Sequence, residues 1–296
     1  MKRFLGILLV AISAAAFGTL AIFGRYADAD GIDVLTVLFF RFSLAAVVMA
    51  MLLVARREPL PRGLALLQLM AMGAVGYVGQ AFCYLTALKY ASAGLVALLL
   101  YLYPVLVAIL STLWLREPMT RWKTFTLGLA LAGTALTVGP EGGQLLGVLL
   151  AISGAAIYSV YILVATHVVK RVSAIQSSTV ILASAGAMSG ILMLAKGPTL
   201  PATGAGWAAI GSLVLIATVL PIVTFLAGLE RIGPTTAAML STLEPVVTVL
   251  LAAQLFGETL RPVTLLGGGL VLLAVLLLTG GEMRNIGPAP VGDLGG

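Results

Sequence analysis

The residues Pro234 to Glu258, PTTAAMLSTLEPVVTVLLAAQLFGE, form an apolar run of membrane-spanning length with Glu244 and Pro245 near its middle. The residues Ala93 to Glu117, AGLVALLLYLYPVLVAILSTLWLRE, repeat this pattern 141 positions earlier. The same offset aligns further pairs along the chain: Pro104 with Pro245, Glu117 with Glu258, Gly6 with Gly147, Phe17 with Tyr158, Leu85 with Leu226, and Gly128 with Gly269. No gap is needed, so residues 5 to 139 and 146 to 280 are predicted to be two copies of one unit.

The composition excludes an ordinary soluble domain. Hydrophobic residues make up 60% of the 296 positions and charged residues only 9%. The single cysteine, Cys83, excludes an internal disulfide, and one histidine offers little for a metal site. We therefore expect an all-α integral membrane protein with no metal, no cofactor and no nucleic-acid partner.

Ten apolar runs of about 20 residues are long enough to cross the hydrocarbon layer. Five fall in the first copy, namely Phe4 to Gly24, Val34 to Ala55, Leu64 to Leu88, Ser92 to Leu115 and Trp122 to Gly139. Five fall in the second, namely Leu145 to Thr166, Ala174 to Ala195, Gly206 to Leu229, Pro234 to Phe256 and Val263 to Gly280. The predicted domains are a first five-helix repeat over residues 1–141, a second over 142–281, and a disordered cytoplasmic tail over 282–296.

Basic residues in the loops predict the orientation of the ten spans. Twelve lie on one side: Lys2, Arg3, Arg56, Arg57, Arg62, Arg116, Arg121, Lys123, Lys170, Arg171, Arg231 and Arg284. Four lie on the other side: Arg25, Lys89, Lys196 and Arg261. Both termini are therefore predicted to face the cytoplasm. Because each copy has an odd number of spans, the two copies enter the membrane from opposite sides, an inverted-topology repeat typical of secondary transporters with a central substrate site.

Three segments of the sequence, spread over both copies, carry a resemblance to a known family. They are FFRFSLAAVVMA with Phe40, Arg41 and Phe42, AFCYLTALKYASAGLVALLLYLYPVLVAIL followed by LREPMT, and FLAGLERIGPTTAAMLSTLEPVVTVLLAAQLFGETL. In this order and at this offset they resemble the EamA-like, ten-helix branch of the drug/metabolite transporter superfamily, and most of all its bacterial aromatic amino-acid exporters. The resemblance implies that helices one to four of each repeat surround a central cavity, while the fifth and tenth stand outside that ring. It also implies a location in a bacterial-type inner membrane and export of small metabolites.

Three prolines fall inside predicted spans and remove a backbone hydrogen bond. Pro104, Pro221 and Pro245 should free the carbonyl groups of Leu100, Ala217 and Ser241 respectively. In lipid, a freed carbonyl needs a partner in protein or in a water-filled cavity. We interpret these prolines as hinges beside the cavity; the alternative is static kinks that a neighbouring hydroxyl satisfies.

A polar stripe on the third span indicates which residues line that cavity. Gly73, Tyr77, Gln80 and Tyr84 recur at spacings of four, three and four, which places them on one helical face. Tyr84 also fits the interfacial aromatic belt. Adding the repeat partners and the residues around the proline bends gives the predicted substrate-binding set: Phe17, Tyr77, Gln80, Tyr84, Tyr101, Tyr158, Thr218, Phe225, Ser241, Thr242 and Glu244. Such an aromatic cavity with few polar groups suits aromatic or bulky apolar substrates.

Two charges lie within spans and break the repeat symmetry, because Arg41 aligns with Leu182 and Glu244 with Tyr103. A charge inside the membrane is a functional hypothesis by default. Arg41 is a possible charge partner for a substrate carboxylate, and Glu244 for an ammonium group or a coupling proton. The alternatives are that Arg41 caps helix ends or snorkels to the outer surface, and that Glu244 is a protonated acid bracing the bend.

The predicted function is a secondary transporter that exports amino acids with aromatic or bulky apolar side chains by alternating access. Nucleotide sugars, sugar phosphates and cationic drugs are the alternative substrates on the same fold. An intramembrane enzyme is disfavoured because the sequence has no Gly-x-Ser-Gly segment, and a channel because no ring of like charges is visible. The expected partners are a small-molecule substrate and membrane lipid, with a monomer and a homodimer both left open.

Overall fold

Apolar helices separated by short loops account for almost all of the computed structural model, which describes residues 2–87, 90–91, 96, 99–138, 144–257 and 261–284. The first repeat contains α1 (Lys2–Gly18), α2 (Leu20–Ala29), α3 (Val34–Ala55), α4 (Gly63–Ala71), η1 (Met72–Tyr77), α5 (Val78–Ala87), α7 (Tyr103–Leu110), η2 (Ser111–Leu115) and α8 (Arg121–Val138). The second contains α9 (Leu145–Val168), α10 (Ala174–Lys196), α11 (Gly204–Val214), η3 (Leu215–Val219), α12 (Leu220–Ile232), α13 (Pro234–Leu240), α14 (Leu243–Phe256) and α15 (Pro262–Arg284). The η segments are π-helical turns inside longer helices.

These elements form ten helical segments, as the sequence predicted. By length and hydropathy alone, seven helices of the described chain qualify as membrane spans, and two shorter apolar helices cover Tyr103–Leu115 and Pro262–Leu278. The expected fourth span, Ser92 to Leu115, lies partly outside the described residues. The protein is thus an all-α, multi-pass membrane protein built from two five-helix repeats.

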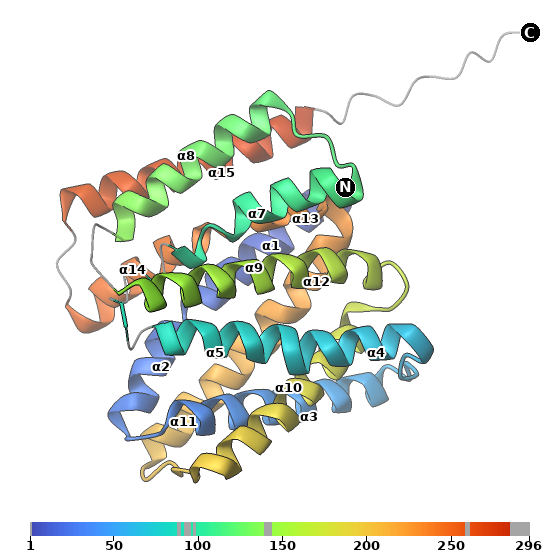
Figure 1. The fold of residues 1–296 in the computed structure, drawn as a ribbon, viewed down its shortest axis with the longest axis vertical. Helices are drawn as coiled ribbons and strands as arrows, with labels where there is room; N and C mark the ends of the chain where they lie inside the picture. Colours follow the sequence, from blue (N-terminus) through green and yellow to red (C-terminus); the bar gives the residue numbers. More distant parts are fainter. Residues whose placement is uncertain are drawn as a thin grey trace, which may run out of the picture.

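The packing of the helices follows the inverted repeat. Helices α1 and α9 occupy equivalent positions in the two copies and run in opposite directions through the bundle (Figure 1). Helix α1 packs on α12, and its equivalent α9 packs on α5. Even single contacts are duplicated: a Cβ on Gly6 would meet Arg231 and Ile232, and one on Gly147 would meet Tyr90 and Ala91. A pseudo-two-fold axis therefore relates the halves.

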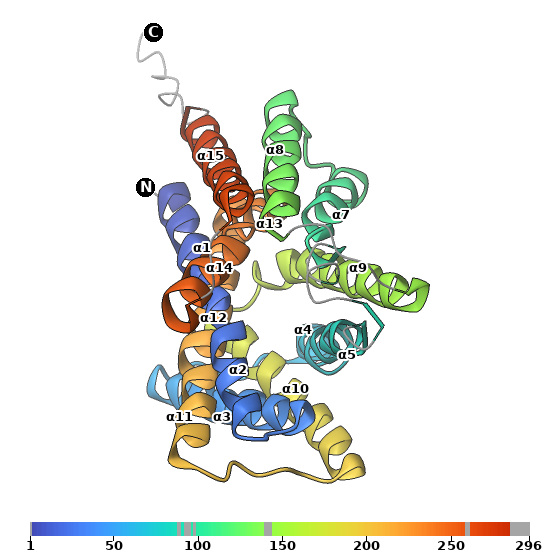
Figure 2. The same cartoon turned by 90° about the vertical axis from the view of Figure 1, so that its left-hand side faces the viewer.

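Helices α8 and α15 pack against each other at one side of the bundle. Figures 1 and 2 show this pair beyond the helices that enclose the centre. Gly133 makes the close approach possible, since a Cβ there would lie 2.7 Å from the Gly267 carbonyl oxygen. This is the arrangement that the family resemblance implies for the fifth and tenth helices.

The first span extends further than predicted, because its helix continues past Gly24 to Ala29. The Arg25 guanidinium lies over the Phe256 ring, 4.3 Å from its centroid, so a charge at this depth is stabilised rather than disruptive. The helix ends where Gly31 adopts a φ of +77°, a left-handed conformation that glycine tolerates. The eighth span likewise runs to Ile232 and ends at Gly233, whose φ is +80°.

Candidate functional site

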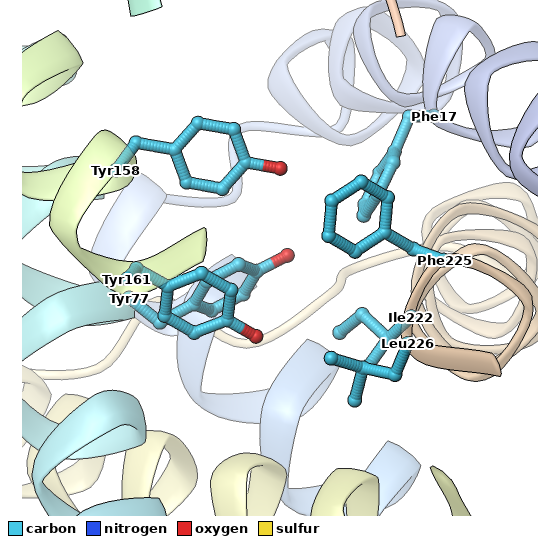
Figure 3. Close-up of a pocket in the computed structure, with 7 residues that line it drawn as sticks. All are labelled: Phe17, Tyr77, Tyr158, Tyr161, Ile222, Phe225 and Leu226. Carbon is cyan, nitrogen blue, oxygen red and sulfur yellow. The ribbon is translucent and has the colours of Figure 1, made fainter. Parts of the chain in front are cut away.

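A small pocket lies between the repeats, and Figure 3 shows the seven side chains around it. Three tyrosines form one wall and four apolar residues form the other: Tyr77, Tyr158 and Tyr161 face Phe17, Ile222, Phe225 and Leu226. The three hydroxyl groups point from the first wall toward the second (Figure 3). The cavity measures about 10 Å³, room for about one water molecule, so a metabolite fits only after the walls separate.

The tyrosine wall continues as an unbroken chain of aromatic contacts through four helical segments. Ring centroids are 5.1 Å apart for Phe42 and Tyr77, 5.9 Å for Tyr77 and Tyr161, and 5.8 Å for Tyr161 and Tyr158. The chain goes on from Tyr158 to Tyr103 at 4.8 Å and from Tyr103 to Tyr101 at 6.3 Å. Each separation is in the range of favourable aromatic pairs. These six residues, called the aromatic chain below, connect α3, η1, α9 and the α7 region.

Arg41 closes one end of the aromatic chain. It lies on the buried face of α3 between Leu38 and Phe42, and only 6% of its surface is exposed. Its Nε donates to the Thr218 hydroxyl at 2.6 Å, and its Nη2 donates to the Tyr77 hydroxyl at 3.4 Å and the Ala217 carbonyl at 3.3 Å. The alternative that Arg41 snorkels to the outer surface is therefore wrong, because these bonds hold the guanidinium inside the bundle.

The partners of Arg41 are related by the repeat. Tyr77 and Thr218 differ by 141 positions, so one asymmetric side chain bridges equivalent sites in the two halves. Each partner also lies in a π-helical turn, η1 or η3. Such turns are rare and occur often at functional sites. Arg41 thus fixes both halves at the point where their helices depart from α geometry.

Pro221 explains why Arg41 reaches the Ala217 carbonyl. Since proline lacks an amide hydrogen, Ala217 loses its normal partner four residues later. The freed carbonyl finds a partner in protein, as expected for a bend within the membrane, and that partner is a charged donor. The Pro221 carbonyl is also bonded, accepting from the Ser13 hydroxyl at 2.8 Å.

Glu244 begins the second half of a broken span. Helix α13 ends at Leu240 and α14 begins at Leu243, with Ser241 and Thr242 in a turn between them. The expected free carbonyl of Ser241 accepts from the Glu244 amide at 3.0 Å, so the turn satisfies it locally. The chain breaks similarly before Pro104, where Tyr101 and Leu102 form a turn ahead of α7.

The Glu244 side chain is partly buried and lies within electrostatic range of Arg41 and of the hydroxyl groups of Tyr77, Tyr101, Tyr103 and Tyr158. No N–O distance of 4 Å or less joins Arg41 to Glu244, and no described side chain donates a hydrogen bond to the Glu244 carboxyl group. Its backbone is fixed instead, because Thr248 donates to the Glu244 carbonyl at 3.1 Å and to the Gly18 carbonyl at 2.9 Å. The acid therefore stands near the aromatic chain with its carboxyl group available to a ligand.

The other sequence-predicted residues lie around the pocket rather than in its wall. Gln80 is partly buried, and its backbone carbonyl lies near Gly154 of α9. Tyr84 packs on a separate cluster of Ala87, Val96 and Ala151. The Ser241 hydroxyl donates to the Ala237 carbonyl and also bonds Tyr103 of the aromatic chain, whereas the Thr242 hydroxyl donates to the Met239 carbonyl within its own helix turn.

Five residues of the site were not selected from the sequence: Tyr161, Ile222 and Leu226 in the wall, and Phe42 and Tyr103 in the aromatic chain. Tyr161 follows Tyr158 by three positions and Leu226 follows Ile222 by four, spacings that share a helical face. That signal could have identified them. Among the described residues, no group of three or more His, Cys, Asp or Glu could hold a metal ion.

Comparison with known proteins assigns the family. The sequence profile of the EamA-like transporter family matches this chain twice, over residues 4–139 and 145–280. The chain belongs to the EamA-like transporter family. The two matches correspond to the two five-helix halves of the structure.

Relatives of this EamA-like protein are described as transporters without a stated substrate. An uncharacterized transporter of Archaeoglobus fulgidus is 28% identical over 272 residues, covering 90% of this chain and 94% of that protein. The uncharacterized transporter YcbK of Bacillus subtilis is 25% identical over 299 residues, covering 95% and 94%. A protein of known crystal structure has a TM-score of 0.83 at 22% identity, covering 93% of this chain and 98% of its own, a likeness of fold. The EamA-like protein is thus a membrane transporter.

Proposed function

We propose that this protein exports small amphipathic metabolites, foremost amino acids with aromatic or bulky apolar side chains, by alternating access. The observation that carries the proposal is the pocket between the repeats, with tyrosines on one wall and phenylalanines and aliphatic residues on the other. The flat aromatic side chains of the two walls offer apolar faces against which the ring of a substrate can pack. The polar tips of the tyrosines supply the few hydrogen bonds that such a site needs.

The charges around the pocket favour a zwitterion over a phosphorylated substrate. Arg41 is the cation at the aromatic chain, and its Nε and Nη2 are already bonded to protein. Its Nη1, which bonds no described residue, is left to donate to a substrate carboxylate. A phosphate needs several such donors. Glu244, whose carboxyl group bonds no described side chain, would take the substrate ammonium or a coupling proton.

The small volume of the pocket supports alternating access as the mechanism. Because the cavity holds about one water, a substrate enters only when one repeat moves relative to the other. The breaks at Ser241 and Thr242 and at Tyr101 and Leu102 supply equivalent points for that movement, next to Pro245 and Pro104. We assign Pro104, Pro221 and Pro245 the role of hinges. Rocking of inverted repeats about a midplane site is the general mode of such folds.

Counterflow in proteoliposomes tests the substrate. Vesicles loaded with unlabelled phenylalanine should accumulate labelled phenylalanine and leucine, and should not exchange labelled aspartate, a nucleotide sugar or a quaternary ammonium drug. Replacing Tyr161 with alanine should raise the half-saturating concentration about fivefold through lost ring contacts. Tyr26→Ala is the matched control, since Tyr26 is 46% exposed and outside the pocket. Absence of flux for every amino acid, with flux of the nucleotide sugar or the drug, would assign those substrates instead.

The role of Glu244 is tested by Glu244→Gln in the same vesicles. A coupling proton on Glu244 predicts that the pH dependence of export disappears in the variant. An ammonium contact predicts a raised half-saturating concentration with the pH profile retained. Unchanged flux and an unchanged pH profile would contradict both roles.

A further inference from the structure

A second hollow lies at the surface where the two repeats meet, at the end of the bundle that carries the N-terminus (Figure 1). It measures about 340 Å³, within the roughly 300–1,000 Å³ of small-molecule sites. Its lining comes from the α3–α4 connection, the first turn of α4, the α9–α10 connection and the first turn of α10: Pro59, Leu60, Pro61, Arg62, Ala65, Arg171, Val172 and Gln176. We call this hollow the basic pocket. It is separate from the aromatic site and shares no residue with it.

The electrostatics of the basic pocket favour an anion. Arg62 and Arg171 both line it, both are exposed, and neither forms an ion pair with a described residue. The two connections that form it carry five basic residues, Arg56, Arg57, Arg62, Lys170 and Arg171, against one acid, Glu58. Glu58 is engaged by the Ser173 hydroxyl, which caps α10. The guanidinium groups therefore face an open cavity without a counter-ion.

The backbone adds to this preference. Helix α4 begins at the pocket, and its N-cap residue, Arg62, supplies no side-chain hydrogen bond to the first turn. The amide groups at a helix start and the positive end of its dipole attract negative charge. Arginine pairs with phosphate through two parallel hydrogen bonds, which makes phosphate the anion that fits two such side chains best.

The surroundings of the basic pocket indicate where that phosphate comes from. Leu60 is 57% exposed in the lining and Leu64 is 62% exposed on the first turn of α4. A water-soluble anion would leave these leucine side chains exposed, whereas a phospholipid that binds through its phosphate would cover them with its acyl chains. Basic pockets between helices at the inner membrane surface are suited to anionic lipid headgroups.

We propose that the basic pocket binds the phosphate of an anionic phospholipid, with Arg62 and Arg171 as its ligands and Leu60 and Leu64 against its acyl chains. The lipid would clamp the two repeats together at this end. The bound lipid would reinforce the hydrogen bond from the Gln176 side-chain Nε2 to the Pro59 carbonyl, which measures 2.7 Å and joins the start of α10 to the α3–α4 connection. This inference concerns lipid binding and goes beyond the transport proposal.

The test uses the full chain purified in a neutral detergent. Phosphatidylglycerol, phosphatidylcholine and inorganic phosphate are titrated separately, and binding is followed by native mass spectrometry and by the melting temperature. We expect phosphatidylglycerol to bind and raise the melting temperature, and the other two to do neither. At about 1 kcal/mol per basic residue, Arg62→Gln and Arg171→Gln should each weaken binding about fivefold and the double variant about 25-fold.

The matched control is Arg121→Gln, an exposed arginine on the same predicted side and outside the pocket, which should bind phosphatidylglycerol like the wild type. Equal melting temperatures of all variants without lipid show that each is folded. Full binding by the double variant, or equal binding of phosphatidylcholine, would overturn the proposal. Equal binding of inorganic phosphate through the same arginines would overturn the lipid as its source. Each result is independent of transport.

Discussion

Single residues show how polar groups are accommodated in a bundle that is otherwise apolar. A charge within a span is costly unless it is bonded, and Arg41 is bonded three times. The sequence predicted its depth and its asymmetry. It did not indicate that Arg41 bonds Thr218 and Ala217, which lie 177 and 176 residues away, because such partners come together only when the halves pack.

Asp33, at the start of α3, is a second charged residue that is stabilised by several bonds, but it lies in a connection outside the predicted spans. Its carboxylate accepts from the Leu35 and Thr36 amides as the N-cap of α3 and pairs with Lys196, while its own amide donates to Thr199. Partial burial raises its pKa, but the Lys196 ammonium and the two amides outweigh that effect and hold the pKa below the ordinary 3.8. The connections after α2 and α10 are thereby joined.

Two substitutions separate the roles of Asp33. We expect Asp33→Ala to lower the free energy of unfolding by about 1 kcal/mol through the lost cap, and Asp33→Asn to cost less because asparagine also caps. Since the pKa is lowered by folding, the wild-type contribution is present above pH 3.8 and is lost as the pH falls through the folded-state value. Thermal unfolding between pH 3 and 7 measures this. A pH dependence that persists unchanged in Asp33→Asn would contradict the assignment.

Most helical irregularities recur at matching places in the two repeats, although η2 has no π-helical counterpart in α14. The turns η1 and η3 lie near equivalent positions, and spans four and nine break ahead of Pro104 and Pro245. The prolines indicated the breaks from sequence alone. The π-helical turns had no such signal, since η1 contains no proline and depends on packing against α10.

A double-mutant cycle tests whether Arg41 caps the carbonyl that Pro221 frees. Arg41→Leu, which introduces the residue found at the aligned position Leu182, should lower the free energy of unfolding by about 1–3 kcal/mol, because it leaves a buried carbonyl unpaired. Pro221→Ala restores an amide that can bond Ala217. In the Pro221→Ala variant, Arg41→Leu should therefore lower the free energy of unfolding by about 1 kcal/mol less than it does in the wild type, as measured by unfolding in mixed micelles. Additive costs would show that Arg41 acts through other contacts.

Gly73 tests the close packing of η1 on α10. An added Cβ would overlap the Ser184 hydroxyl and the Ile181 carbonyl, and backbone atoms do not yield easily. We expect Gly73→Ala to cost about 1–3 kcal/mol. Gly128→Ala is the control, because nothing lies within 4 Å of its Cβ position and alanine favours a helix by up to about 1 kcal/mol. A lower melting temperature for the Gly128 variant than for the Gly73 variant would contradict the packing argument.

At the scale of the whole molecule, ten segments place the start of α1 and the end of α15 at the same end of the bundle (Figure 1). The excess of basic residues predicts that this end faces the cytoplasm. We expect a green fluorescent protein fused to the C-terminus to fluoresce and an alkaline phosphatase fused there to be inactive. A phosphatase fused after Thr199 should be active. The reverse pattern would invert the orientation.

The helices, their number and the inverted repeat follow from the amino-acid sequence, because apolar length and a fixed offset of 141 residues are local or linear properties of the chain. The sequence also selected Phe17, Tyr77, Tyr158 and Phe225, which the structure brings into one pocket. The packing of the helices showed in addition that Tyr161, Ile222 and Leu226 complete the walls and that Arg41 bridges the repeats. Sequence periodicity could not show this, because nearly every face of these helices is apolar and the lipid side looks like the interior. Which side faces the interior is set by the fit of side chains between helices far apart in sequence.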